Sequence, residues 1–358
     1  MSNASRPAAE ADTKVRLSAI LPNYNHARYL PRAIAAITAQ LGPEDELIVI
    51  DDASLDDSVA VIAKLAEGDR RIVPMQNAVN QGALVTLQRG LDAASGRFVY
   101  FAAADDEILP GFFKAALMVL EANAACGLFC ADAILRDGES GLVTGHRPVV
   151  RPRARGGFVA PAAAREMFRK ADNFILTGSS VFRRTALVEK GGFDARNGSF
   201  ADGLLARKVA MGHGFHYEPR AAAVWNIFAD GLSRSTALDV AKAERALREI
   251  PARLAQDTDF PSWYPALFER RWRFGAARLA IAADPPDRDL LMAMAARTRL
   301  DSTVLGLLAR IDWLPGGRLP ALVWISLRLR PFRFRDVLRT ALARKLEAVT
   351  RRRPRADK

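Results

Sequence analysis

Cysteine is scarce in this chain of 358 residues, which contains only Cys126 and Cys130. With no histidine close by, this pair is too small a ligand set for a disulfide framework or a structural zinc site. The apolar residues around them (CGLFC) favour two buried thiols in a reducing compartment.

Long apolar runs are also missing, which argues against membrane-spanning helices. The longest, residues 319–327 (LPALVWISL), is followed by arginines and is far shorter than the roughly 18 residues that a spanning helix needs. Residues 1–12 are small and polar, without an apolar segment of signal-peptide length. We therefore expect a flexible N-terminus over residues 1–14 and a cytoplasmic protein.

Glycine-rich phosphate-binding motifs are also missing after the predicted strands. No dinucleotide-binding or P-loop fingerprint follows a predicted strand, and residues 212–214 (GHG) lack both a preceding strand and a third glycine. Dinucleotide redox chemistry and P-loop phosphoryl transfer therefore lose their main support.

Positive charge is in excess but unevenly placed. The formal net charge is +12. Residues 318–358 contain thirteen Lys and Arg against three Asp and Glu, a local charge of +10, so residues 1–317 carry only +2. A nucleic-acid-binding protein usually concentrates charge on a folded reading surface. We therefore expect no nucleic acid partner, although binding through the basic tail stays open as an alternative.

The composition and periodicity indicate a folded α/β protein. Half of the residues are hydrophobic and about a quarter are charged. Short apolar runs at residues 15–21, 47–50 and 98–102 are typical of buried parallel strands, and residues 29–41 and 58–66 have helical spacing. Strands that alternate with helices over the first 130 residues predict a doubly wound sheet.

Polar clusters follow three of the predicted strands, at residues 22–25, 51–54 and 105–107. In a doubly wound sheet, ligands bind beyond the carboxyl ends of the strands, near the point where strand order reverses. We therefore expect the three clusters to line one crevice.

The second half of the chain has a different character. Residues 142–168 are irregular and rich in Pro and Arg, which predicts a long, functional surface loop. Beyond about residue 236 only helical patterns occur, interrupted by prolines. The sequence therefore predicts a helical C-terminal region over residues 236–358 that ends in the basic tail.

Several short motifs carry a resemblance to a known family. In chain order they are LPNYN (21–25), IVIDDAS (48–54), NQG (80–82), GRF (96–98), ADD (104–106), TGSSVFRR (177–184) and GGFD (191–194). In order and spacing they resemble the family 2 glycosyltransferases, over residues 15–235. The resemblance implies a GT-A fold, which is Rossmann-like with a mainly parallel sheet. It also implies an inverting transfer of a sugar from a UDP-, GDP- or dTDP-sugar to a hydroxyl of a glycan or lipid-linked acceptor.

The resemblance assigns donor binding to residues of the strand-end motifs. Carboxylates there can accept hydrogen bonds from a base and a ribose, the role implied for Asp51 and Asp52, with Asp52 favoured. A turn that caps the next helix is the alternative for this pair, and a surface position is the alternative for Arg89. The residues implied for nucleotide-sugar binding are Pro22, Asn23, Tyr24, Asn25, Asp51, Asp52, Asn80, Gly82, Arg89 and Asp105.

Asp105 and Asp106 match the family's metal-binding acidic motif. Hard oxygen ligands suit Mg²⁺ or Mn²⁺, which neutralise a diphosphate leaving group. Ala103 stands where relatives often have an acid, and Phe228 stands where they often have a histidine. A helix-capping pair is the alternative.

Asp202, in FADGLLARKVAMG, resembles the family's (E)DxxLxxR segment, whose acid is the proposed catalytic base. Inverting transfer needs one carboxylate to take the acceptor hydroxyl's proton. Ala201 replaces the neighbouring acid, so the base assignment depends on Asp202 alone. The alternative is an N-cap for the following helix.

Residues 318–358 combine apolar side chains at near-helical spacing with arginines. A basic amphipathic helix suits an anionic membrane surface. It would place the protein peripherally on the inner face of the membrane, which would be useful for cell-surface polysaccharide biosynthesis with lipid-linked acceptors. A basic helix packed on the catalytic domain is the alternative. A degenerate family member that binds nucleotide-sugar without catalysis also stays open, given Ala103, Ala201 and Phe228.

Overall fold

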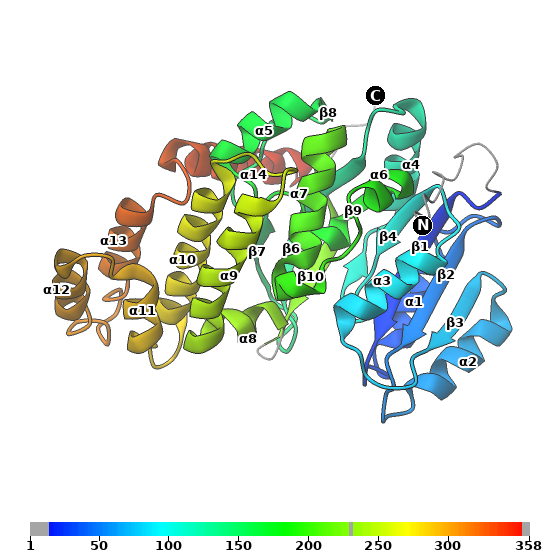
Figure 1. Ribbon diagram of the computed structural model, residues 1–358, viewed down its shortest axis with the longest axis horizontal. Coiled ribbons are helices and arrows are strands. Elements are labelled where there is room, and N and C mark those ends of the chain that lie inside the picture. The colour runs from blue at the N-terminus through cyan, green and yellow to red at the C-terminus, as the bar shows by residue number, and fades with distance from the viewer. Residues whose placement is uncertain (1–13, 229–231, 353–358) are drawn as a thin grey trace, which may run out of the picture. The chain divides into compact units, whose positions relative to one another are not determined.

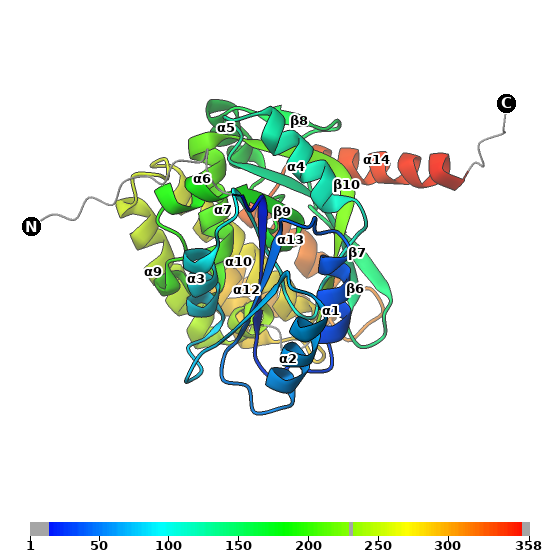
Figure 2. The ribbon, with the colours of Figure 1, turned by 90° about the vertical axis from the view of Figure 1, so that its right-hand side faces the viewer.

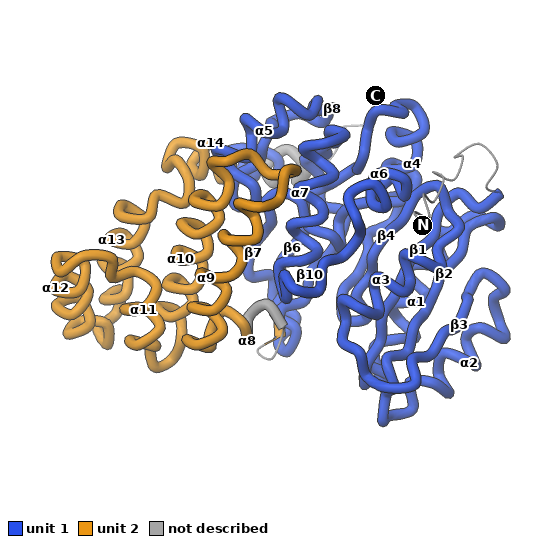
Figure 3. Tube along the Cα trace, in the orientation of Figure 1, with its two compact units in different colours: residues 1–227, 342–358 blue, residues 228–341 orange. Residues whose placement is uncertain are grey.

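The chain, in a computed structural model, is described over residues 14–228 and 232–352. It divides into two compact units, residues 1–227 with 342–358 (unit 1) and residues 228–341 (unit 2) (Figure 3). Residues 342–358 thus group with unit 1, whereas the sequence assigned them to the C-terminal region. The predicted flexible N-terminus lies outside the described residues except for its last residue, and so does the end of the basic tail, residues 353–358.

Within the described residues, unit 1 is built on one sheet of ten strands (Figure 1). Its order is β3-β2-β1-β4-β9-β6-β10-β5, with β7 beside β6 and β8 beside β10. The strands are β1 (Leu17–Asn23), β2 (Glu46–Asp51), β3 (Ile72–Gln76), β4 (Phe98–Phe101), β5 (Glu107–Ile108), β6 (Leu128–Asp137), β7 (Val143–Arg147), β8 (Gly157–Val159), β9 (Ser180–Arg183) and β10 (Phe215–Ile227).

The β3-β2-β1-β4 part of the sheet is wholly parallel, as the alternation of strands and helices predicted. Strand β9 then lies antiparallel between β4 and β6, and β10 runs parallel to β6. The predicted doubly wound α/β sheet is confirmed, and the antiparallel insertion makes it a mixed sheet.

The prediction of a long irregular loop over residues 142–168 is wrong. This segment contains β7, which pairs with β6, and β8, which pairs with β10. Helix α5 (Pro161–Lys170) also begins inside it. Strand β7 is largely solvent-exposed, so its sequence lacks the apolar alternation by which a half-buried strand is identified.

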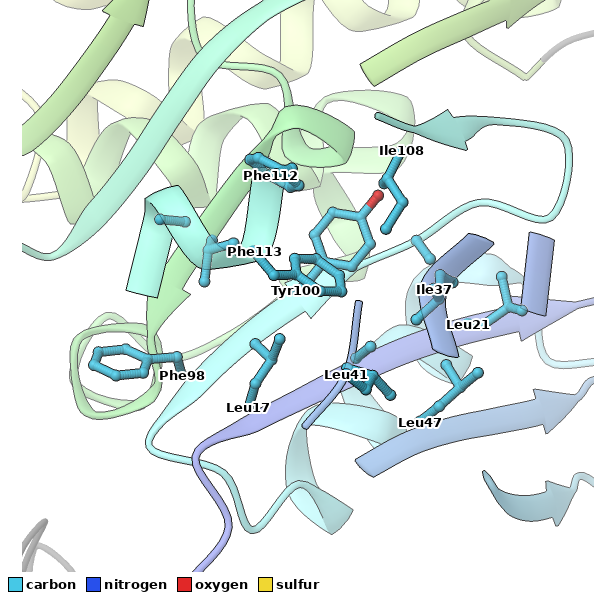
Figure 4. Packing of buried hydrophobic residues seen from close by; sticks show 14 of the residues in the cluster. Leu17, Leu21, Ile37, Leu41, Leu47, Phe98, Tyr100, Ile108, Phe112 and Phe113 are labelled. Atoms are coloured by element: carbon cyan, nitrogen blue, oxygen red, sulfur yellow. The ribbon is translucent and has the colours of Figure 1, made fainter. Parts of the chain in front are cut away.

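Helices cover both faces of the β1-β2-β3 region, as Figure 2 shows for α1 and α2 on one side and α3 on the other. The side chains of Leu17 and Leu21 pack with α1, α2 and α4 in the main core, part of which Figure 4 shows. A Cβ at Gly90 of α3 would lie 2.4 Å from Ile20 Cγ2 and 2.9 Å from Ile50 Cδ1, so glycine lets α3 approach the other face closely. The remaining helices of unit 1 are α1 (Leu30–Thr38), α2 (Ser58–Gly68), α3 (Ala83–Ala93), α4 (Phe112–Ala122), α6 (Arg184–Glu189) and α7 (Ala201–His213).

Unit 2 is helical, as predicted for this part of the chain. Alanines of α10 allow close packing against Leu290, Met294 and Ile325 in its core. Among the helices of the described residues, none has both the length and the apolar character needed to cross a membrane. The helices are α8 (Leu232–Leu238), α9 (Val240–Gln256), α10 (Tyr264–Ala282), α11 (Arg288–Ala295), α12 (Arg299–Leu308), α13 (Leu319–Leu329) and the first part of α14 (Phe334–Arg352).

Both cysteines are free and buried, as predicted. Burial raises the pKa of the Cys126 thiol to about 11 and that of Cys130 further above its ordinary value. Neither thiol is therefore prepared for nucleophilic chemistry.

Candidate active site

The first polar cluster forms where β1 and β2 end side by side. Asn23 and Asp51 are partners in the parallel register. The amide Nδ2 of Asn23 donates to Asp51 Oδ1 at 2.9 Å and to Ser54 Oγ at 3.2 Å. Among the described residues, Oδ1 of Asn23 is buried without a hydrogen-bond partner. Since an unsatisfied buried acceptor is destabilising, this oxygen is a candidate ligand contact.

The loops after these strands are joined to each other. Asn25 donates from its backbone N–H to Ser54 Oγ at 2.9 Å, and its Oδ1 accepts from the N–H of Leu55 at 2.7 Å. Asn25 and Ala53 both have positive φ, at 55° and 59°, which is strained for residues other than glycine. Tyr24 directly precedes Asn25 and has 41% of its surface exposed, so its ring is available for stacking.

Asp52 organises the loop before helix α3. Its Oδ1 accepts from Asn77 Nδ2 at 2.7 Å and from the N–H of Gln81 at 2.9 Å, and its Oδ2 accepts from the N–H of Gly82 at 2.8 Å. Burial opposes ionisation of Asp52, but these hydrogen bonds, with a contribution from Thr86, outweigh it and lower the pKa.

Asp51 has more acceptor capacity left for a ligand than Asp52. Its Oδ1 accepts from Asn23 and its Oδ2 from the N–H of Ser54 at 2.9 Å. Each carboxylate oxygen can accept about two hydrogen bonds, so one site remains on each oxygen of Asp51, whereas Oδ1 of Asp52 is full. Asp51 thus has the larger unused acceptor capacity, and donor contact by Asp51 or Asp52 stays a prediction.

Arg89 and Asn80 support the same loop. Arg89 Nη1 donates to the carbonyl of Gln76 at 2.8 Å and to Asn77 Oδ1. Asn80 Oδ1 accepts from the N–H of Gly82 at 3.0 Å. Asn77 was not predicted as a site residue, although it directly follows β3 and is thus a polar residue at a strand end like the predicted ones. Donor binding by Asn80, Gly82 and Arg89 stays a prediction.

The acidic pair Asp105 and Asp106 follows β4, at the same end of the sheet. The N–H of Asn226 donates to Asp106 Oδ1 at 3.0 Å, and its Nδ2 donates to the Asp105 carbonyl at 2.5 Å. Burial and the negative charge of Asp105 raise the pKa of Asp106 to about 8, although the Asn226 hydrogen bond opposes this shift. Asn226 was also missed, because only its place in β10 brings it here.

A short segment connects the acidic pair with Asp202. Residues Thr177–Ser179 form a 3₁₀ turn, and a Cβ at Gly178 would lie 3.7 Å from Asp106 Oδ2. Tyr100 donates from its hydroxyl to the Gly178 carbonyl at 3.2 Å. Thr177 Oγ1 donates to Asp202 Oδ2 at 2.9 Å. The structure therefore brings the acidic pair and Asp202 to the same two-residue segment.

Asp202 lies in the first turn of α7 and is not its N-cap, since Phe200 holds that position. The capping alternative is therefore wrong, and the carboxylate bonds to Thr177 in another segment instead. The role of Asp202 as a catalytic base stays a prediction.

The acidic pair fits a divalent cation. Burial, and next the charge of Asp105, oppose the ionisation of Asp106, and a cation bound to both carboxylates would offset these two effects. No group of three or more His, Cys, Asp and Glu able to hold a metal is found in the described ranges. The protein thus offers two carboxylates, and further ligands would come from a bound molecule or water.

Comparisons with known proteins find glycosyltransferases. Residues 18–186 match the family model "Glycosyl transferase family 2". The GalNAc(5)-diNAcBac-PP-undecaprenol beta-1,3-glucosyltransferase of Campylobacter jejuni is 41% identical over 97 residues, which cover 27% of this chain and 31% of that relative. The succinoglycan biosynthesis protein ExoO of Rhizobium meliloti is 27% identical over 62% of this chain and 63% of its own length. The chain spans less than two thirds of the length of these relatives.

Solved structures show the same fold. The mannosyltransferase PcManGT from Pyrobaculum calidifontis, in complex with GDP-Man and Mn²⁺, has a TM-score of 0.56 and 19% identity, covering 91% of this chain and 86% of that one. TarS 1–349 of S. aureus, in complex with UDP-GlcNAc, has a TM-score of 0.52 and 17% identity, covering 94% of this chain and 92% of its own. The expected GT-A fold is confirmed.

Proposed function

The chain belongs to glycosyltransferase family 2 through residues 18–186, and on this premise we propose that it is an inverting glycosyltransferase that moves a sugar from a nucleotide-sugar to a hydroxyl acceptor. The observation that carries the proposal is the segment Thr177–Gly178. A Cβ placed at Gly178 would lie 3.7 Å from Asp106 Oδ2, and Thr177 donates a hydrogen bond to Asp202, so this segment lies near both acids. A diphosphate site and a base for the acceptor would then lie close together, as direct displacement at the anomeric carbon requires.

The donor would bind over the ends of β1, β2 and β3. Asn23 offers a buried acceptor oxygen, Asp51 offers carboxylate capacity, and Tyr24 offers an exposed ring. These groups suit a base with N–H donors and a ribose with hydroxyls. The neighbouring structures that hold GDP-Man or UDP-GlcNAc support a UDP-, GDP- or dTDP-sugar as the donor class.

Asp105 and Asp106 would hold Mg²⁺ or Mn²⁺. The ion would supply positive charge to the departing diphosphate. Support comes from the raised pKa of Asp106, which burial and then the charge of Asp105 cause, and from the Mn²⁺ in the PcManGT complex. Asn226 holds both residues of the pair in place through its backbone N–H and side-chain amide.

Asp202 would take the proton of the acceptor hydroxyl. The hydrogen bond from Thr177 fixes Oδ2, so the proton would pass to Oδ1 as the acceptor oxygen forms its bond to the sugar. The acceptor would be a growing glycan or a lipid-linked sugar, as the names of the Campylobacter jejuni and Rhizobium meliloti relatives suggest. Work on such an acceptor in cell-surface polysaccharide biosynthesis would place the enzyme on the cytoplasmic face of the membrane.

A thermal-shift screen of UDP-, GDP- and dTDP-sugars, each with and without Mn²⁺, tests the donor assignment. We expect one nucleotide class to raise the melting temperature by several degrees in the presence of metal, because a ligand that binds only the folded state stabilises it. NMR of the product anomer then tests inversion. No response to any donor would contradict the proposal.

A donor-binding protein without catalytic activity is the second candidate, favoured by Ala103, Ala201 and Phe228 at positions where relatives often have functional side chains. The screen alone does not separate it from an enzyme. Release of nucleoside diphosphate above the uncatalysed rate, in the presence of a hydroxyl acceptor, would exclude it.

A further inference from the structure

Helix α14 is drawn from the side in Figure 2. Its C-terminal half, which belongs to unit 1, contacts the rest of that unit through polar side chains. Arg344 Nη2 donates to Asp132 Oδ2 at 3.3 Å and to the Pro148 carbonyl at 2.7 Å. Glu347 accepts two hydrogen bonds from Arg151, at 2.5 and 3.1 Å. Asp132 and Arg151 are buried and paired with each other at 2.8 Å, so one side of α14 joins a buried charge network.

The opposite side of α14 is apolar and exposed. Phe334, Leu338, Leu342 and Leu346 recur every four residues and have exposed fractions of 81%, 48%, 52% and 67%. At 3.6 residues per turn, the three leucines are centred about 170° from the direction of Arg344 and Glu347. A surface helix normally turns its apolar stripe toward its own protein. In α14 the polar side faces the protein, so the stripe is available to something outside it.

Charge distinguishes between the occupants that could cover this stripe. Arg335, Arg339 and Lys345 are all exposed and flank the leucines. The acidic residues among the described side chains of α14, Asp336 and Glu347, lie on the other half of the helix. A second copy of this face would meet like charge. An anionic lipid surface would meet both the apolar stripe and its basic borders.

Helix α13 repeats the apolar part of this pattern within unit 2. Leu319, Val323 and Leu327 recur every four residues and are exposed. Ala321, Ile325 and Leu329, on the other side of the helix, are buried in the unit 2 core. Helices α13 and α14 therefore both have an exposed apolar stripe.

We infer that the outward face of α14, defined by Phe334, Leu338, Leu342 and Leu346, docks in the headgroup region of an anionic bilayer. The leucines enter the apolar boundary, and Arg335, Arg339 and Lys345 pair with lipid phosphates. The Arg344 and Glu347 side stays bound to unit 1, so docking needs no unfolding of the helix end. This surface is separate from the candidate active site and does not depend on the proposed sugar transfer.

Cosedimentation of the full chain with vesicles tests the inference. We expect at least tenfold stronger partitioning onto vesicles of phosphatidylglycerol and phosphatidylcholine than onto phosphatidylcholine alone. The triple substitution L338Q/L342Q/L346Q should reduce this partitioning at least tenfold. Neutralisation by R335Q/R339Q/K345Q should remove the preference for anionic lipid, and 0.5 M NaCl should weaken wild-type binding because salt screens surface charge.

A matched control replaces three exposed apolar residues elsewhere, M118Q/L142Q/V188Q, and should bind vesicles like the wild type. Circular dichroism and the melting temperature show whether the variants fold. Equal binding by the wild type and the leucine variant, or no preference for anionic vesicles, would overturn the inference. A dimer in analytical ultracentrifugation that the leucine substitutions dissociate would also overturn it, in favour of a second copy. Transfer to a water-soluble acceptor should be unchanged in every variant, which keeps this test separate from that of the proposed function.

Discussion

The two halves of the candidate site are held together in different ways. Where β1 and β2 end, Asp51 and Asp52 accept hydrogen bonds from their own chain, and those to Asp52 outweigh burial and lower its pKa. At the acidic pair, burial and the charge of Asp105 raise the pKa of Asp106, with one opposing hydrogen bond from Asn226. The carboxylates of the first half are stabilised by hydrogen bonds from their own chain, whereas burial and a neighbouring charge oppose the ionisation of Asp106 in the second half.

This difference indicates separate tasks for the carboxylates. A carboxylate that organises a loop is needed for folding, and its removal exposes unsatisfied N–H groups. A carboxylate held in a partly uncompensated site stores unfavourable electrostatic energy that binding can relieve. Substitutions in the two halves should therefore affect different measurements, namely stability for the loops and catalysis or metal binding for the acidic region.

The largest effect is expected for Asp202→Asn. Loss of a general base typically lowers the rate by about 10² to 10⁴, so we expect a fall in kcat of about a thousandfold. The amide can still accept from Thr177, so the melting temperature and donor affinity should change little. Steady-state kinetics and thermal denaturation measure the two outcomes. Asp92→Asn on the exposed side of α3 is the matched control. A variant that folds, binds the donor and keeps the full rate would remove Asp202 from the base role.

The next-largest effect is expected for the stability of Asp106→Asn, and it depends on pH. Its pKa is about 8 in the folded state against an ordinary value of 3.8, so between these pH values the folded protein binds more protons than the unfolded chain. The stabilising contribution is complete below about pH 4 and is lost as the pH rises through about 8. In the absence of metal, Asp106→Asn should therefore be more stable than the wild type at pH 8.5, by about 3 kcal/mol after allowance for solvent screening, and nearly equal at pH 4.

Urea unfolding with EDTA at both pH values measures this difference. Addition of Mn²⁺ at pH 8.5 should stabilise the wild type and leave the Asp106→Asn variant almost unchanged, because the ionised pair is the proposed ligand. If the free energy of unfolding changed with pH in the same way for both proteins, the pKa of Asp106 would not be raised in the folded state. The contrast between the two halves of the site would then disappear.

Much of this arrangement was predictable because it follows from the geometry of parallel strands. The strands that end at Asn23, Asp51 and Phe101 were indicated by short apolar runs, and polar residues after such strands gather at one edge of the sheet. Asn226 was not predictable in this way. It reaches the acidic pair because β10 pairs with β5 at Val224 and Glu107, a long-range register that no local pattern reports.

The sequence also did not indicate which face of α14 contacts the rest of the protein. Apolar periodicity predicted an amphipathic helix, and by the usual rule its leucines would point inward. In the structure the side with Arg344 and Glu347 points inward instead, because buried Asp132 and Arg151 provide ionic partners that are distant in sequence. The two alternatives left open for the tail do not exclude each other: from Leu342 onward, α14 packs on the rest of unit 1 through Arg344 and Glu347, while its leucines stay exposed.

The smallest effect is expected for Asp52→Ala, which tests the donor half. The substitution would leave the N–H groups of Gln81 and Gly82 and the amide of Asn77 without their acceptor, which should lower the free energy of unfolding by about 2 kcal/mol. Donor affinity should fall less than for Asp51→Ala, because Asp51 has the spare acceptor capacity. Urea unfolding of both variants measures the stability, and titration with the donor measures the affinity. A stable Asp52→Ala protein that no longer binds donor would assign Asp52 to the ligand, and the loops would then depend on a ligand as much as the acidic pair does.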